Sequence, residues 1–145
     1  MIPNDLLKAL EDLDWELYVA LADSLLKIDM AYLDNEILGH STMYAYYAGL
    51  SEQANMEKKK CENKMESYEA GLKNSARNTL SKTTVAAIQD YVSTDITLQD
   101  MKKDLEEKTY KCGLLKSLIT SMQHRKDLII QLSSNRRAET RMITD

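Results

Sequence analysis

The sequence is poor in residues that make turns. It contains one Pro and four Gly among 145 residues, and it has no Phe. A β-sandwich or β-barrel needs many tight turns, which these residue types usually supply, so the composition excludes an all-β fold. The chain is long enough for one domain with a modest core. We therefore expect an all-α protein.

Long apolar runs and disulfide patterns are also missing. No run approaches the roughly 18 residues of a membrane span, and the start lacks the basic and apolar stretches of a secretory signal. We expect a cytoplasmic protein. Cys61 and Cys112 have no CxxC motif and no neighbouring His, so we interpret both as small apolar residues on helix faces.

Residues for catalysis or metal binding do not cluster in the sequence. Glu36 and His40 are four residues apart, whereas helical di-metal sites repeat the motif Glu-x-x-His. His124 lies among charged residues with no nucleophile beside it, and the four Gly are scattered singly, which excludes a phosphate-binding loop. We expect no enzyme activity, no metal and no cofactor; an enzyme of unrecognised type stays a third alternative.

Charge is segregated along the chain. Residues 1–55 contain ten acidic and two basic side chains, a net charge of −8, although the whole chain carries only −4. Residues 108–145 contain eight basic and three acidic side chains, a net charge of +5. The chain is therefore acidic first and basic last.

Residues 1–40 form the expected acidic N-terminal helices. An apolar stripe with spacings of three and four residues, from Leu6 to Ile28, predicts one amphipathic helix. A second, shorter helix is expected over residues 29–38. It should end near Gly39 and His40, because glycine readily adopts the left-handed conformation that closes a helix.

Residues 41–137 predict a long antiparallel helical hairpin that resembles a coiled coil. Ser41 is the expected N-cap of the first arm, and the capping cluster Ser93-Thr94-Asp95 predicts a break near residues 93–96. Beyond it, apolar residues recur every three and four positions up to Ser133, with Lys108 and Lys126 also on this seam. Residues 138–145 are expected to be a flexible tail.

The two arms are too long to be covered by one compact core. At about 1.5 Å per residue, the first arm would be on the order of 60 Å long. We therefore expect the arms to pair and the chain to form a homo-oligomer. The expected packing and oligomer seam consists of Tyr47, Leu50, Cys61, Met65, Leu72, Leu105, Cys112, Leu115, Ile119, Met122 and Ile129.

Basic residues form three candidate contact sets for DNA phosphates, each of which would give salt-dependent binding. The alternative interpretation of each set is a solvated helix face with internal ion pairs. Tyr44 and Tyr47 are three residues apart and are expected to pack in the core rather than to stack on bases. The three sets are Lys58, Lys59, Lys60 and Lys64; Lys73, Arg77 and Lys82; and Arg125, Lys126, Arg136, Arg137 and Arg141.

Several spaced residues occur in an order that a known family shares. They are Ile28-Asp29, Leu33, Glu36, Tyr44 and Tyr47, then Thr83-Thr84-Val85, Tyr91-Val92-Ser93-Thr94-Asp95 and Leu98, and finally Arg125 and Ile129. In this order they resemble the UvsY recombination mediators of tailed phages, over residues 28–137. The family's basic motif Leu-Lys-Ala-Arg-Leu is not intact, because its nearest match is Leu72-Lys73-Asn74-Ser75-Ala76-Arg77.

The resemblance implies a non-enzymatic helical protein that assembles into a ring of roughly six to eight subunits and binds single-stranded DNA. Such mediators act in DNA recombination, repair and replication by helping a RecA-like recombinase to displace single-strand DNA-binding protein. Lys73 and Arg77 are the only residues carried over from the family's DNA-contact motif. The alternative is a structural or adaptor coiled coil, such as a phage scaffold or assembly chaperone, that does not bind DNA.

Overall fold

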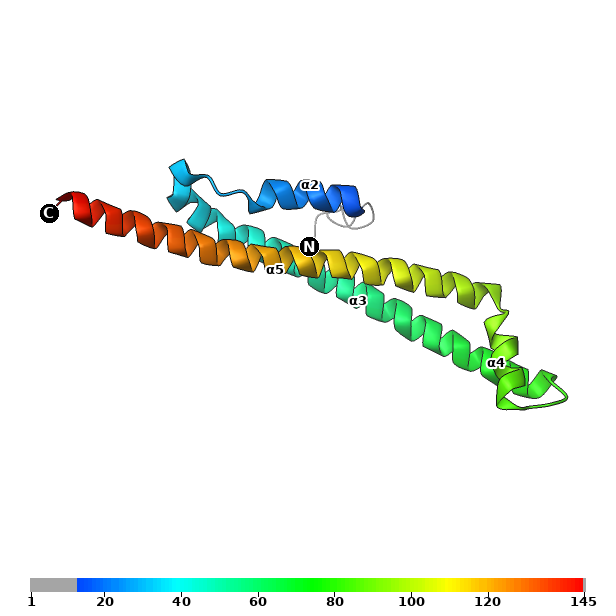
Figure 1. Cartoon of the computed structure of the whole chain (residues 1–145). Coiled ribbons are helices and arrows are strands. Elements are labelled where there is room, and N and C mark those ends of the chain that lie inside the picture. Colours follow the sequence, from blue (N-terminus) through cyan, green and yellow to red (C-terminus); the bar gives the residue numbers. More distant parts are fainter. Residues whose placement is uncertain (1–12, 145) are drawn as a thin grey trace. The chain divides into compact units, whose positions relative to one another are not determined.

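The computed structural model describes residues 13–144, and all regular structure in that range is helical (Figure 1). The elements in chain order are α2 (Trp15–Leu26), the short 3-10 helix η1 (Met30–Tyr32), α3 (Leu33–Thr79), α4 (Val85–Ser93) and α5 (Ile96–Thr144). The two long helices, α3 and α5, pack against each other in opposite directions. The all-α antiparallel hairpin with a short N-terminal helix is therefore confirmed.

The helix α2, the first that the structure describes, is shorter than the apolar stripe from Leu6 to Ile28 predicts. Asp14 caps α2, because its carboxylate accepts a hydrogen bond of 2.8 Å from the backbone N–H of Leu17. The helix ends at Leu26, since Lys27 adopts an extended conformation with ψ of 141°. Ile28 therefore lies outside α2, and the part of the predicted helix before Leu13 lies outside the described residues.

The predicted boundary at Gly39 and Ser41 is wrong, because α3 begins at Leu33 and continues through both residues. The true start signal is Asp29, whose carboxylate caps η1 at the N–H of Ala31 at 2.8 Å. The N–H of Asp29 donates to Glu36 at 3.0 Å. Gly39 keeps a helical conformation, at a cost of about 1 kcal/mol relative to alanine. Packing of the neighbouring His40, which is buried, offsets this cost.

The turn between α4 and α5 is held by side chains of the capping cluster. Asp95 accepts a hydrogen bond of 2.8 Å from the N–H of Leu98, and Gln99 donates to the carbonyl of Ser93 at 2.9 Å. At the start of α4, the hydroxyl of Thr84 accepts from the N–H of Ala87 at 3.3 Å. α5 is then helical without interruption to Thr144, through the segment that we predicted to be a flexible tail.

The chain forms two compact units, each of which contains part of α3 and part of α5. Unit 1 comprises Met1–Glu52 and Gly113–Asp145, and unit 2 comprises Gln53–Cys112. Leu33, Leu118 and Met122 are among the most deeply buried side chains of unit 1, and Val92 and Leu98 hold this place in unit 2. No helix in the described part of the chain is long and apolar enough to cross a bilayer.

The seam residues pack inside the chain. Lys126, however, was expected on the seam and is exposed, while Arg125 is buried in its place. The seam therefore steps from Met122 to Arg125 to Ile129, a choice that spacing alone does not fix. The buried seam residues are Leu50, Cys61, Cys112, Leu115, Met122 and Ile129; Tyr47, Met65, Leu72, Lys108, Leu105, Ile119 and Ser133 are half-buried.

Candidate nucleic-acid interface

The lysines at Lys58, Lys59, Lys60 and Lys64 lie on α3 in unit 2. Lys58 is half-buried and forms an ion pair of 3.5 Å with Glu62, one turn further along the helix. The other three are exposed and have no ion pair among residues 13–144. Acidic side chains intervene, since Lys60 and Lys64 share a hollow of about 310 Å³ with Glu57 and Asp104.

The second set is also mostly engaged within the chain. Lys73 forms an ion pair of 2.7 Å with Glu69, and a guanidinium nitrogen of Arg77 donates to the side-chain oxygen of Asn74 at 2.9 Å. Lys82 is exposed in the connection between α3 and α4. Such surface pairs contribute little to stability, but Glu69 places a negative charge beside Lys73 and so reduces its attraction for a phosphate, whereas the amide of Asn74 is neutral.

Pairing between positions four residues apart recurs along the helices. In each pair a carboxylate lies within 4.0 Å of a lysine Nζ, so these lysines face their own acids before any external anion. The pairs are Lys27–Asp23, Lys58–Glu62, Lys73–Glu69, Lys108–Asp104 and Lys111–Glu107.

Arg125 is a correction to the predicted DNA contacts, because it lies in the core of unit 1 with only 3% of its surface exposed. Its guanidinium forms an ion pair with Glu36 and donates to the carbonyl of Lys27 at 2.9 Å. A second nitrogen lies 3.3 Å from the ring Nδ1 of His40. A guanidinium engaged on all sides inside the chain has no surface left for a phosphate, so Arg125 joins the N-terminal segment to both long helices instead.

The electrostatics of this buried cluster follow from its contacts. The hydrogen bond from the N–H of Asp29 is the main reason why the pKa of Glu36 lies below its ordinary value, and Arg125 lowers it further. Burial is the main reason why the pKa of His40 is lowered, with repulsion from Arg125 and Lys126 adding to it. Glu36 is therefore the carboxylate that balances the buried guanidinium, and His40 is held neutral beside it.

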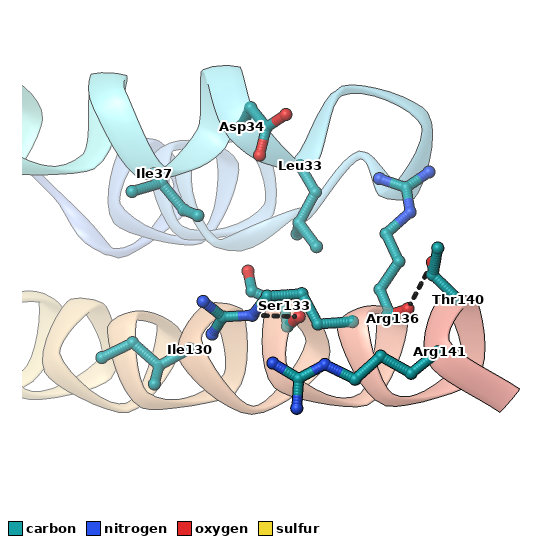
Figure 2. Close-up of a pocket in the computed structure, with 9 residues that line it drawn as sticks. Leu33, Asp34, Ile37, Ile130, Ser133, Arg136, Thr140 and Arg141 are labelled. Atoms are coloured by element: carbon teal, nitrogen blue, oxygen red, sulfur yellow. Dashed lines mark hydrogen bonds between the residues drawn. The ribbon is translucent and has the colours of Figure 1, made fainter. Parts of the chain in front are cut away.

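The C-terminal arginines line a groove of unit 1. This groove has a volume of about 730 Å³ and lies between the first turns of α3 and the last turns of α5 (Figure 2). Arg136 extends from α5 toward the beginning of α3, past Leu33 (Figure 2). The residues that line the groove are Leu33, Asp34 and Ile37 from α3, and Ile130, Ser133, Arg136, Arg137, Thr140 and Arg141 from α5.

The arginine groove differs from the lysine sets in charge and in apolar content. Its lining contains three guanidinium groups and one carboxylate, that of Asp34. The Nε of Arg137 donates to the carbonyl of Ser133 at 3.2 Å, which fixes the base of this side chain on the helix. Arg136 is exposed, and its guanidinium has no partner in the described part of the chain. The N-terminal end of α3 adds a partial positive charge at the same place.

The remaining chemistry-bearing side chains are engaged or isolated. The thiol of Cys61 donates to the carboxylate of Asp104 at 3.2 Å, and burial, followed by that carboxylate, raises the pKa of the thiol. A thiol with a raised pKa is a poor nucleophile. Among residues 13–144, no three His, Cys, Asp or Glu side chains come together in a way that could hold a metal ion.

Sequence reasoning identified the arginines of the groove but not its walls. Packing arguments place the wall residues on helix faces, but only the pairing of α3 with α5 brings them beside the arginines. The wall residues are Leu33, Ile37 and Ile130. The ion pair of Glu36 and Arg125 joins residues 89 positions apart and was also missed. The one available signal was the position of Glu36 and His40 on the same side of a helix.

Comparisons with protein-family models, with curated proteins and with solved structures find no match for this chain.

Proposed function

We propose that the chain is a non-enzymatic protein that binds single-stranded DNA as a homo-oligomer and promotes loading of a RecA-like recombinase in place of single-strand DNA-binding protein. The arginine groove is the observation that carries the DNA part of this proposal. It joins an excess of guanidinium groups to an apolar wall.

The charge of the groove favours a phosphate ligand. Arginine presents a planar set of donors that matches phosphate oxygens, and clustered positive charge is the common basis of nucleic-acid binding. Four lysines of unit 2 face a partner acid four residues away, and Lys60 and Lys64 share a hollow with Glu57 and Asp104. Arg136 and Arg137 instead line a groove whose lining includes the single carboxylate of Asp34. On electrostatic grounds the proposal therefore assigns phosphate contact to the groove.

The apolar wall favours an unpaired strand over a duplex. In a duplex the bases are stacked inside and only the grooves and backbone reach a protein, whereas the bases of a single strand are accessible to apolar side chains. Ile37 and Ile130, which are both exposed, provide such a surface beside the guanidinium groups. The recombinase and the single-strand DNA-binding protein enter the proposal through the resemblance to the UvsY mediators.

Fluorescence anisotropy with a labelled single-stranded oligonucleotide, titrated with NaCl, tests the DNA-binding part. The test variant is Arg136→Glu/Arg137→Glu. The control is Lys59→Glu/Lys60→Glu, which makes the same change in net charge on exposed positions of α3. We expect the arginine variant to lose at least about tenfold in affinity and to reduce the log–log salt slope by about 1.4, because single strands give about 0.7 per neutralised phosphate. The control should keep the slope.

Two results would overturn the DNA-binding part: no binding by the unmodified chain at about 50 mM NaCl, or an equal loss in both variants. Loading of a recombinase is tested separately, by whether the chain shortens the lag of a RecA-like recombinase on DNA coated with single-strand DNA-binding protein. Unchanged lag times would remove the mediator role and leave the DNA binding intact.

A structural or adaptor coiled coil is the second candidate function. The ion pairs between lysines and acids four residues apart favour it, because they are typical of a solvated helix surface. Oligomers that show no salt-sensitive affinity for the oligonucleotide in the same titration would select this alternative.

A further inference from the structure

Residues 37–51 of α3 contain no charged side chain, and this is the longest such run in the chain. It spans 15 residues in a sequence with 29% charged residues, and the next longest runs contain eight. Part of the run faces inward, because His40, Leu50 and Ser51 are buried. A helix of 15 residues makes about four turns, so the remaining residues of the run cover its outer side as well.

The outer side of this run is exposed in unit 1. Leu38, Thr42, Ala45 and Gly49 follow one another at spacings of four, three and four residues, which places them on one face of α3. All four are exposed, Leu38 to 75%, and so is the neighbouring Tyr46, to 46%. Nothing in the described part of unit 1 covers this face, which we name the uncharged face.

An exposed face of this kind is unusual for a helix that meets only water. The centres of protein interfaces are depleted in charged residues and enriched in tyrosine, whereas solvated helix surfaces alternate acids and bases. The remainder of α3 follows the second pattern, with ion pairs at Lys58–Glu62 and Lys73–Glu69.

We propose that the uncharged face is the contact between two copies of this chain, with α3 of one copy packed against α3 of the other. The partner is inferred by matching the charge of the two surfaces that would meet. The face offers no charge to a phosphate backbone or to a charged peptide, so its complement is a surface that is equally uncharged over about four turns. Within this sequence only residues 37–51 provide one. A two-fold contact brings the same surface of both copies together, as this match requires.

The inference specifies the homo-oligomer part of the proposed function, and it holds whether or not the chain binds DNA. The interface residues also differ from those of the arginine groove. Leu38, Thr42, Ala45, Tyr46 and Gly49 do not line that groove, whose α3 wall is made of Leu33, Asp34 and Ile37. Assembly and DNA binding can therefore be impaired separately.

Sedimentation equilibrium of the full chain, from about 5 to about 500 μM and without DNA, tests the inference. The test variant is Ala45→Glu, which places a charge in the middle of the uncharged face. The matched control is Ala70→Glu, at an exposed position of the same helix in a charged stretch. Glutamate is a good helix former, so circular dichroism should show unchanged helicity in both variants.

We expect the unmodified chain and the control to associate. The Ala45→Glu variant should need at least about tenfold higher concentration to do so, because burying an unpaired charge in an interface is costly. Association of the unmodified chain should persist in about 0.5 M NaCl, since salt screens charges but does not weaken apolar contacts.

Three results would overturn the inference. The first is an unmodified chain that stays monomeric at about 500 μM. This result counts against the inference whatever covers the uncharged face within that monomer. The second is an Ala45→Glu variant that associates as well as the control. The third is association that dissolves in about 0.5 M NaCl, which would assign it to attraction between acidic and basic parts of two copies. The variant Arg136→Glu/Arg137→Glu should keep its mass, which separates failure of this inference from failure of DNA binding.

Discussion

Replacing Arg125 with alanine should destabilise unit 1 strongly. The side chain is 3% exposed, and the change removes the partner of the Glu36 carboxylate, whose own side chain is only 20% exposed. Removing one member of a buried ion pair costs about 3–5 kcal/mol because the other charge is left unbalanced. Glu36 keeps its hydrogen bond from the N–H of Asp29, so we expect the lower end, about 3 kcal/mol. For a chain of this size that lowers Tm by about 6–12 °C.

Two optical signals can follow this loss. Trp15 is the single tryptophan and lies on α2, so its fluorescence reports on the N-terminal segment, while circular dichroism at about 222 nm reports on all helices. Arg125 also donates to the carbonyl of Lys27, just after α2, so the tryptophan signal should change at lower urea than the helical signal. Arg77→Ala is the control at an exposed arginine. A loss below about 0.5 kcal/mol, equal to that of the control, would refute the role given to the buried cluster.

Two further predictions concern single positions of α3. The pKa of His40 is lowered by burial and by nearby Arg125, so the unfolded chain binds the proton more readily than the folded one. Stability should therefore fall as the pH decreases from about 7.5 to about 5.5, and His40→Gln should flatten this dependence in thermal melts; an unchanged dependence would contradict the assignment. Gly71 is exposed within α3 and has open space where a Cβ would lie, so Gly71→Ala should raise the free energy of unfolding by about 0.5–1 kcal/mol in urea titrations, and a decrease would contradict an open helix surface.

The helical hairpin was predictable because long-range periodicity encodes it. Apolar residues at spacings of three and four require a helix and a partner helix, and the turn residues between them are few. The cap at Asp95 was predictable from local chemistry, because a carboxylate before an apolar repeat accepts hydrogen bonds from the free N–H groups at a helix start.

Boundaries and the buried cluster were not predictable from local rules. Ser41 has the chemistry of an N-cap and Gly39 that of a helix end, but tertiary packing of Leu33 and His40 extends the helix through both. Spacing permits either Arg125 or Lys126 on the seam. The choice depends on Glu36, which lies 89 residues away in sequence and becomes a neighbour only when α3 pairs with α5.

Charge is arranged differently on three parts of α3. The buried residues of its inner face are apolar apart from Ser51 and His40. The buried guanidinium of Arg125 needs Glu36 and His40 as partners and so specifies how α3 and α5 align. Of the five lysines that α3 has in unit 2, Lys58 and Lys73 are paired with acids, and the whole chain carries a net charge of −4, which gives little general attraction for DNA. The proposed DNA contact at Arg136 and Arg137 would be weak by itself, because it involves few charges. Two copies joined through a face that carries no charge would present two grooves to one strand, and the combined affinity would exceed that of either groove alone.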